Sequence, residues 1–350
     1  MERARAMSGG FDVTPLPNSP FGGLLRLRAP AGPDYTRALI AAAEAEPHAI
    51  PAALAEYEGL LLVPGLHGMA QDPALLVRLS RLFGEEVENY HETLTEPTKV
   101  HETVPEILVV SNMPPASKPP PPLPNPPRTA DGGLPMQYPH RRGWHTDQSY
   151  RRPPPDISLF FAAIAVPKGQ GQTLFANCAG AYEALPAATK ARIAHLDGLH
   201  VMPGSGRSPD AIRAGKTPKP LAPHEQPQRQ PLVRIHPVTG KPSLYLCEEG
   251  QLDWINGPVV GMEPGPDGEG GGLIRELMSH LTQPQFTYAQ DWDDGDMIIW
   301  DNRCLVHAAT WFDADRHQRL MWRTTVRGNP GPEYAGERRS WIPQREAEPA

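Results

Sequence analysis

Apolar residues along the 350-residue chain fall mainly into short runs separated by glycine and proline, a pattern typical of β-strands joined by turns. We predict strands over 58–63, 107–111, 157–166, 173–176, 232–236, 243–247, 285–289, 296–300, 304–308 and 319–326. Alanine-rich composition or helical spacing predicts helices over 34–57, 71–85, 180–196 and 271–283, the first interrupted by prolines. We therefore expect a mainly β single domain over 1–350, with a core at about 55–328, a proline-rich insert at 113–142 and a peripheral tail at 329–350.

Composition supports a strand-rich chain and excludes several classes of protein. The 44 prolines and 32 glycines disfavour a mostly helical fold. The net charge of −7 gives no basic footprint for nucleic acid. The arginines near the start precede no apolar stretch that would make a secretory signal, and the run 157–166 is too short to span a bilayer. Because Cys178, Cys247 and Cys304 are odd in number and far apart, we expect buried reduced thiols in a cytoplasmic protein.

The strongest chemical signal is a His-x-Asp pair, His145 and Asp147. On a strand, residues i and i+2 point to the same face, so these two side chains can bind one ion together, and His307 can supply a third ligand. Two histidines and one carboxylate on one side of a metal are typical of non-haem Fe(II) oxygenases. A second pair, His195 and Asp197, ends a helical stretch in which such residues diverge, so we interpret His195 as structural.

Two arginines follow His307 on a predicted strand. Arg319 and Arg323 are four residues apart and share a face, whereas Leu320 and Trp322 point the other way. Inward arginines on a core strand are costly unless an anion pairs with them, and a guanidinium binds a carboxylate bidentately. A dicarboxylate co-substrate would therefore satisfy both. Pairing with core carboxylates, or exposure to solvent, is the alternative.

Further motifs accompany these residues in a fixed order between about residues 60 and 328. They are Phe83-Gly84-Glu85, Ile107 to Asn112, Trp144 to Asp147, Gly171 to Phe175, Val233 to Gly240, Gly295 to Arg303, His307, and Arg319 with Arg323. On these motifs the sequence resembles the taurine dioxygenase / aryloxyalkanoate dioxygenase (TauD/TfdA) family of Fe(II)- and 2-oxoglutarate-dependent oxygenases. The resemblance implies a double-stranded β-helix (jelly roll) with flanking helices and a metal in its mouth. It also implies an enzyme that uses Fe(II), 2-oxoglutarate and O2 and releases succinate and CO2.

The resemblance also assigns individual roles. The iron ligands of the family match His145, Asp147 and His307. Thr173 and Arg319 match the residues that bind the distal carboxylate of 2-oxoglutarate. Arg323 matches an arginine near the metal-bound carboxylate, where it can also meet an anionic substrate. We expect Trp144 and Trp300 to pack beside the site.

The chain departs from the family where substrate would bind. Asn89 and His91 replace the pattern that the taurine enzyme uses near its sulfonate, and Arg141 and Arg142 stand where that enzyme has small amides. A basic pocket mouth would favour a small anionic substrate, namely a sulfonate, sulfate ester, aryloxyalkanoate or amino-acid-like carboxylate. We expect substrate contacts from Asn89, His91, Asn112, Arg141 and Arg323. Solvent-facing Arg141 and Arg142 are the alternative, and desaturation is an alternative to hydroxylation.

The proline-rich insert stands where family members carry a loop that closes over the substrate. Nine of the fourteen residues from 114 to 127 are proline, which excludes a helix or a central strand and predicts an extended, polyproline-like segment. We predict that 113–142 is a stiff flap that orders when substrate is present. A plain linker is the alternative.

Two other classes of protein remain open at this point. A Zn-dependent jelly-roll hydrolase could use the same three ligands plus water, but it would leave Arg319 and Thr173 without a role. A non-enzymatic binding module would leave no reason for three intact ligands. We expect a small-molecule substrate and no nucleic-acid or membrane partner, and the sequence leaves a homo-oligomer open.

Overall fold

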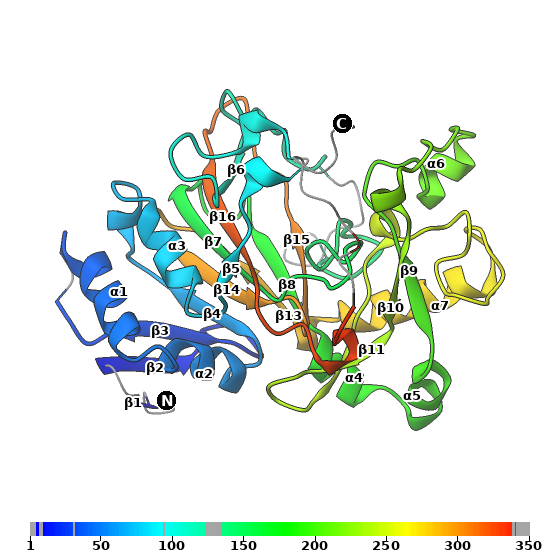
Figure 1. Cartoon of the computed structure of the whole chain (residues 1–350), viewed down its shortest axis with the longest axis horizontal. Coiled ribbons are helices and arrows are strands. Elements are labelled where there is room, and N and C mark those ends of the chain that lie inside the picture. Colours follow the sequence, from blue (N-terminus) through cyan, green and yellow to red (C-terminus); the bar gives the residue numbers. More distant parts are fainter. Residues whose placement is uncertain are drawn as a thin grey trace.

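The computed structural model describes residues 5–6, 10–30, 32–93, 95–123, 135–337 and 340 (Figure 1). Within these residues, nine strands form one large sheet in the order β1-β2-β3-β4-β14-β7-β16-β5, with β6 also paired to β16. Their bounds are β1 Arg5–Ala6, β2 Phe11–Pro15, β3 Gly23–Leu27, β4 Leu60–Val63, β5 Glu86–Val87, β6 Leu108–Ser111, β7 Ile157–Ile164, β14 Met297–Asp301 and β16 Leu320–Arg327.

A smaller sheet faces the large one and completes the jelly roll. Its strands, in the order β13-β8-β15, are β13 Thr287–Gln290, β8 Thr173–Asn177 and β15 Leu305–Ala309. Two further antiparallel pairs join β9 (Asp197–His200) to β10 (Gln228–Pro231) and β11 (Val233–Ile235) to β12 (Pro242–Leu244). The mainly β fold that we predicted is therefore confirmed.

Helices cover both flanks of this β core. They are α1 Tyr35–Ala45, α2 Ala49–Glu56, α3 Ala74–Ser80, α4 Cys178–Ala184, α5 Ala187–Ile193, α6 Pro209–Arg213 and α7 Glu269–Leu281. Helices α1 to α3 lie on one side of the molecule and α4 to α7 on the other (Figure 1). Proline limits their length, because the predicted helix 34–57 is two helices separated near Pro47, and the predicted helix 180–196 is divided at Pro186.

Three apolar clusters hold these layers together. One lies between the large sheet and α1 to α3, and another joins the small sheet to α4 and α7. The third fills the space between the two sheets and includes Phe160, Phe175 and Trp300. Strands β7 and β14 are buried on both faces, which explains why their sequences are continuous apolar runs instead of alternating ones.

Several predicted boundaries were wrong. Strand β3 was not predicted, because its run of five residues is short and lies close to a turn. The segment 203–230, predicted as loop, contains α6 and β10, and Asp197 begins strand β9. Parts of the predicted tail, of the chain start and of the proline-rich insert (124–134) lie outside the described residues.

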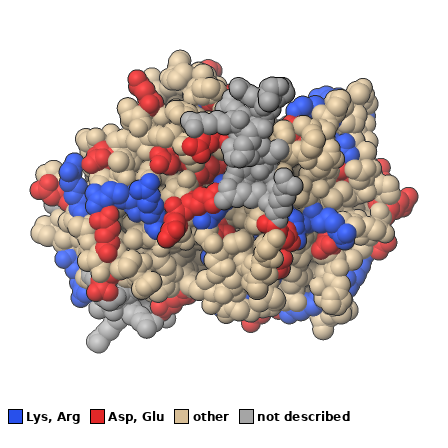
Figure 2. Space-filling view, in the orientation of Figure 1, with Lys and Arg blue, Asp and Glu red and all other residues tan. Residues whose placement is uncertain are grey.

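No helix in the described part of the chain is both long enough and apolar enough to cross a membrane. Positive and negative side chains are interspersed on the face shown in Figure 2.

Gly59 lies between α2 and β4, where the core leaves little space for a side chain. Its backbone has φ +83°, and an added Cβ would lie 2.6 Å from Sγ of Cys304. Gly59→Ala should therefore destabilise the protein by about 2–4 kcal/mol, combining backbone strain with overpacking. Gly65→Ala, at φ +80° with nothing near its Cβ, should show only the smaller backbone cost. Urea denaturation measures both, and equal losses for the two variants would exclude the steric contribution.

Candidate metal centre and active site

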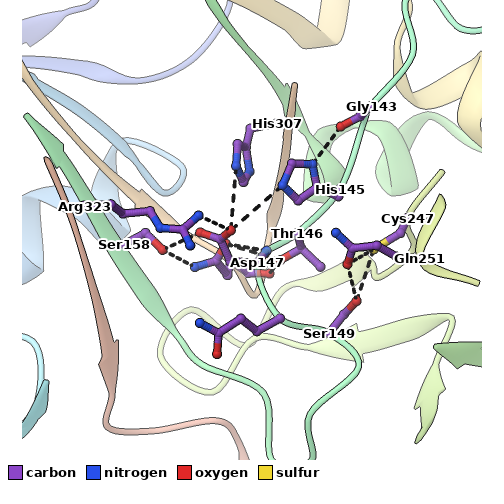
Figure 3. A network of polar contacts seen from close by, with 12 residues as sticks. Gly143, His145, Thr146, Asp147, Ser149, Ser158, Cys247, Gln251, His307 and Arg323 are labelled. Atoms are coloured by element: carbon purple, nitrogen blue, oxygen red, sulfur yellow. Dashed lines mark hydrogen bonds and ion pairs between the residues drawn. The ribbon is translucent and has the colours of Figure 1, made fainter. Parts of the chain in front are cut away.

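Three predicted ligands meet between the two sheets. Nε2 of His145 and Nε2 of His307 each lie 3.9 Å from Oδ1 of Asp147 (Figure 3). All three ligand atoms lie within 4.8 Å of one another. Since metal–ligand bonds to nitrogen and oxygen are about 2 Å long, one ion between the three side chains could contact them all after a small inward adjustment.

The backbone brings the two histidines together. The N–H of His145 donates to the carbonyl of His307 at 2.9 Å, and the N–H of His307 donates back at 2.7 Å. This isolated antiparallel bridge joins His145 to the edge strand β15 of the small sheet. Nδ1 of His145 lies 2.7 Å from the carbonyl of Gly143, which fixes the ring so that Nε2 faces Asp147.

The Asp147 carboxylate is held from several strands. Nη1 of Arg323 on β16 donates to Oδ1 at 2.6 Å, and Oγ of Ser158 on β7 donates to Oδ2 at 2.8 Å. Asn302, which follows β14, accepts the Asp147 N–H at 3.1 Å and donates to Ser158 at 2.9 Å. Asn302 also accepts the indole N–H of Trp300 at 2.9 Å, so this one amide connects the ligand to the core.

These neighbours set the ionisation of the ligands. Burial opposes the charge on Asp147, but Arg323 and the two histidines more than offset it and hold the pKa of Asp147 at about 2. Burial, reinforced by His145, lowers the pKa of His307 to about 3. An ionised carboxylate and a neutral imidazole are the forms that bind a metal.

Asp147 does not lie on a strand, so this part of the prediction was wrong. The chain makes a bridge at His145 and then turns over residues 147–150, with Gln148 at φ +51°. Glu88 holds that unusual conformation, because its carboxylate accepts from Nε2 of Gln148 at 2.7 Å. Arg151 and Arg327 balance the charge of the buried Glu88, at 2.5 and 3.1 Å.

Two other predicted residues, Arg319 and Thr173, lie on segments that meet at Gly171. Arg319 precedes β16, is 8 % exposed, and donates through Nη2 to the carbonyl of Gly171 at 3.2 Å. Its Nε is buried without a hydrogen-bond partner, and no described carboxylate pairs with it. Burial lowers the pKa of Arg319 to about 10. Thr173 begins β8, two residues after Gly171, and its hydroxyl accepts the indole N–H of Trp292 at 3.1 Å.

The residues predicted to touch substrate are placed unevenly. Asn89 uses its side chain locally, accepting from the N–H of His91 and donating to Glu92, and His91 is exposed. Asn112 lines a cavity together with Arg319, but its amide is engaged by the backbone of residues 314, 317 and 319. It therefore shapes the loop that carries Arg319.

The predicted basic pair ahead of the metal motif does not act as a pair. Arg142 is bound by Glu248 at 3.1 Å. Arg141 is half-buried, its Nε has no partner, and burial lowers its pKa. His195 is exposed and belongs to neither three-residue cluster of ligand-type side chains in the described residues, as expected of a structural residue.

A second cluster of metal-ligand type, formed by His236, Asp301 and Cys304, has a structural explanation. Arg303 and His236 contact Asp301 at 2.6 and 2.9 Å, so its charge is already balanced. The three cysteines are free and buried, as predicted.

Sequence reasoning missed several residues that support the site. Ser158 lies within an apolar strand pattern, where a lone serine gives no signal, and Glu88 lies far from the ligands in sequence. Asn302 could have been found, because it immediately follows the apolar strand that leads to His307.

The residues present fit a divalent metal. Nε2 of each histidine faces the Asp147 carboxylate, and the protonation states are those that a metal needs. The guanidinium of Arg319, which no described carboxylate neutralises, lies just before β16, the strand that carries Arg323.

The fold and the ligand set define a class: a jelly roll that carries a two-histidine, one-carboxylate centre. A family model described as "Taurine catabolism dioxygenase TauD, TfdA family" matches residues 26–325. The chain belongs to this family.

Individual relatives agree with that assignment. The (S)-phenoxypropionate/alpha-ketoglutarate-dioxygenase of Sphingobium herbicidovorans is 36% identical over 197 residues, which cover 55% of this chain and 64% of the relative. The alpha-ketoglutarate-dependent 2,4-dichlorophenoxyacetate dioxygenase of Cupriavidus pinatubonensis is 31% identical over 52% of this chain and 59% of its own length. These matches thus span less than two thirds of either relative. A crystal structure of AAD-2 in complex with Mn(II) and N-oxalylglycine is 27% identical with a TM-score of 0.62, covering 91% of this chain and 97% of that one.

Asn302 provides a test of how Asp147 is held. Asn302→Leu removes the acceptor for the Asp147 N–H and the donor to Ser158, so the carboxylate should lose its fixed orientation. We expect Mn(II) affinity, measured by calorimetry, to fall about 10- to 100-fold while the fold persists. Ser158→Ala should have a smaller effect, because it leaves Asn302 bound to the Asp147 N–H and to the indole of Trp300. Unchanged Mn(II) affinity in Asn302→Leu would contradict this role.

Glu88 should make stability depend on pH. Burial opposes its ionisation, but Arg151 and Arg327 lower its pKa from 4.5 to about 2. Its contribution is therefore complete above about pH 5 and is lost as the pH falls toward 2. At pH 7, Glu88→Gln should lower the free energy of unfolding by about 3–5 kcal/mol, because Arg151 and Arg327 both lose an ion pair with a buried carboxylate.

The difference between the parent protein and Glu88→Gln should shrink when urea denaturation is repeated at pH 3. Glu85→Gln, at an exposed position, is the matched control and should change little at either pH. A difference that stays constant from pH 7 to pH 3 would contradict the assigned ionisation.

Proposed function

We propose that this protein is an Fe(II)- and 2-oxoglutarate-dependent dioxygenase that hydroxylates a small anionic organic substrate. Succinate and CO2 are the co-products. His145, Asp147 and His307 would hold the iron, and Arg319 with Thr173 would bind the distal carboxylate of the co-substrate. Family membership supports the reaction class, and the relatives' names point to carboxylate-bearing substrates.

The observation that carries the proposal is Arg319. A buried guanidinium without a carboxylate partner among the described residues is costly, so Arg319 calls for an anion from outside the chain. The planar N–H donors of Arg319 suit a carboxylate. The Gly171 carbonyl, two residues before Thr173, accepts from Arg319 and thereby positions its guanidinium. A hydrolytic zinc site would give Arg319 no partner.

Each part of the chain then has a defined task. Iron, when bound, would activate O2 together with the keto acid and thereby oxidise a C–H bond. Arg319 and Thr173 orient the co-substrate, while Arg323 keeps Asp147 ionised and turned toward the histidines. The apolar surroundings of Phe160, Phe175 and Trp300 limit water near the centre.

The co-substrate role predicts a specific defect. Arg319→Leu should raise the KM for 2-oxoglutarate at least a hundredfold, since removing one partner of a buried charged pair costs about 3–5 kcal/mol. Mn(II) affinity should hardly change, because Arg319 touches no metal ligand. Arg37→Leu, on an exposed side chain, is the control.

The measurement is succinate release and O2 consumption with Fe(II) and ascorbate. An unchanged KM in Arg319→Leu would remove the co-substrate role. A parent protein that never consumes 2-oxoglutarate, or a His307→Ala variant with full turnover, would refute the proposed function as a whole.

A further inference from the structure

A cavity of about 240 Å³ opens between β6, the described part of the proline-rich insert and the loop before β16. Its lining includes Asn112, Lys118, Pro119, Phe312 and Arg319. Two of these residues are cations, and no carboxylate belongs to the described lining. The proline-rich segment therefore forms one wall of the space that contains Arg319.

The backbone fixes where Lys118 enters this wall. The N–H of Lys118 donates to the carbonyl of Ser111, the last residue of β6, at 2.7 Å, and the N–H of Ser117 donates to Met113 at 2.8 Å. Residues 113–118, which include Pro114 and Pro115, thus fold back against β6 before the run Pro119 to Pro122. Because β6 pairs with β16, this turn places Lys118 beside the strand that carries Arg323 and follows Arg319.

The charge around Lys118 is not balanced within the described residues. Lys118 is exposed, and its ammonium forms no salt bridge or side-chain hydrogen bond with the described residues. Burial lowers the pKa of Lys118, and Arg323, Lys99 and Arg319 lower it further. Asp147 is the one acidic group that acts in the opposite direction, and Arg323 already pairs with it.

The charges of the cations and of the co-substrate indicate that a second anion, the primary substrate, can bind in the same space. The co-substrate of the proposed function is a dianion: one carboxylate is needed at Arg319, and the other lies at the metal. Its binding would leave Lys118, which lines the same cavity as Arg319, without a carboxylate partner among the described residues. A positive group in this position favours a further negative charge on whatever molecule shares the space.

We propose that Lys118 is a specificity-determining residue that pairs with the anionic group of the primary substrate. This inference rests on the proposed function and deepens it. We predicted that Arg141 and Arg142 attract the anionic substrate. Because Glu248 already neutralises Arg142, we now assign this role to Lys118.

The test compares Lys118→Met with Lys216→Met, a matched control on an exposed lysine elsewhere. Each protein is loaded with Mn(II) and N-oxalylglycine and titrated calorimetrically with (S)-2-phenoxypropionate, methanesulfonate or hexyl sulfate, and with the neutral 2-phenoxypropionamide. Lys118→Met should weaken binding of the preferred anion about 10- to 100-fold, as expected for loss of a charge-assisted hydrogen bond. Binding of the amide, and all binding by Lys216→Met, should not change.

A second measurement separates Lys118 from the co-substrate. The KM for 2-oxoglutarate, measured from Fe(II)-dependent succinate release, should stay within about twofold of the parent value in Lys118→Met, because the proposed partner of Lys118 is the primary substrate and not the co-substrate. A large rise in that KM would overturn the proposal by assigning Lys118 to the co-substrate. Equal anion binding by Lys118→Met and the parent, or a parent that binds none of the anions, would also overturn it.

These outcomes do not depend on turnover. A parent protein that releases succinate from 2-oxoglutarate but ignores the anions refutes only the role of Lys118. A parent that binds an anion through Lys118 but never consumes 2-oxoglutarate refutes only the proposed function. Thermal melting of both lysine variants shows that the fold is retained.

Discussion

The buried negative charge of Asp147 is the constraint on which the site depends. An ionised carboxylate between two sheets is stable only if it is paired and hydrogen-bonded. The partners come from strands distant in sequence: Arg323 from β16, Ser158 from β7 and Asn302 from the end of β14. The same contacts therefore close the large sheet and aim the carboxylate, so that the fold and the site cannot be assembled separately.

The two arginines at β16 differ in whether a carboxylate of the protein balances their charge. Asp147 raises the pKa of Arg323 despite its burial, so this guanidinium is bound within the protein. Arg319 has no such partner, and burial alone lowers its pKa to about 10. Arg323, which pairs with Asp147, stabilises the site within the protein. Arg319, which has no carboxylate partner among the described residues, is suited to bind a ligand. Sequence spacing could place both on one face but could not separate these roles.

Local pattern and recognised motifs account for what could be predicted from the sequence. The apolar runs that form β7 and β14, and the candidate metal cluster of His145, Asp147 and His307, could be located from residue order. Predictions failed where distant contacts decide the outcome. The turn at Gln148 depends on Glu88, sixty residues away. The substrate contacts of Asn89 and His91 stay a prediction, and the Asn89 side chain accepts from the nearby N–H of His91. The position of Lys118 could not be predicted, because the composition of the proline-rich insert indicated only a stiff, extended segment.

The hydrogen bond from Trp292 to Thr173 has a consequence for molecular discrimination. The indole N–H occupies one of the two lone pairs of the threonine hydroxyl, and the hydroxyl keeps its proton to donate to a bound molecule. The guanidinium of Arg319 offers only N–H groups. Both side chains can thus donate a hydrogen bond to a bound molecule. A carboxylate, which only accepts, fits them without loss, whereas an amide of the same shape would set its own N–H groups against them. By occupying one lone pair of Thr173, the indole of Trp292 therefore favours a bound group that accepts hydrogen bonds.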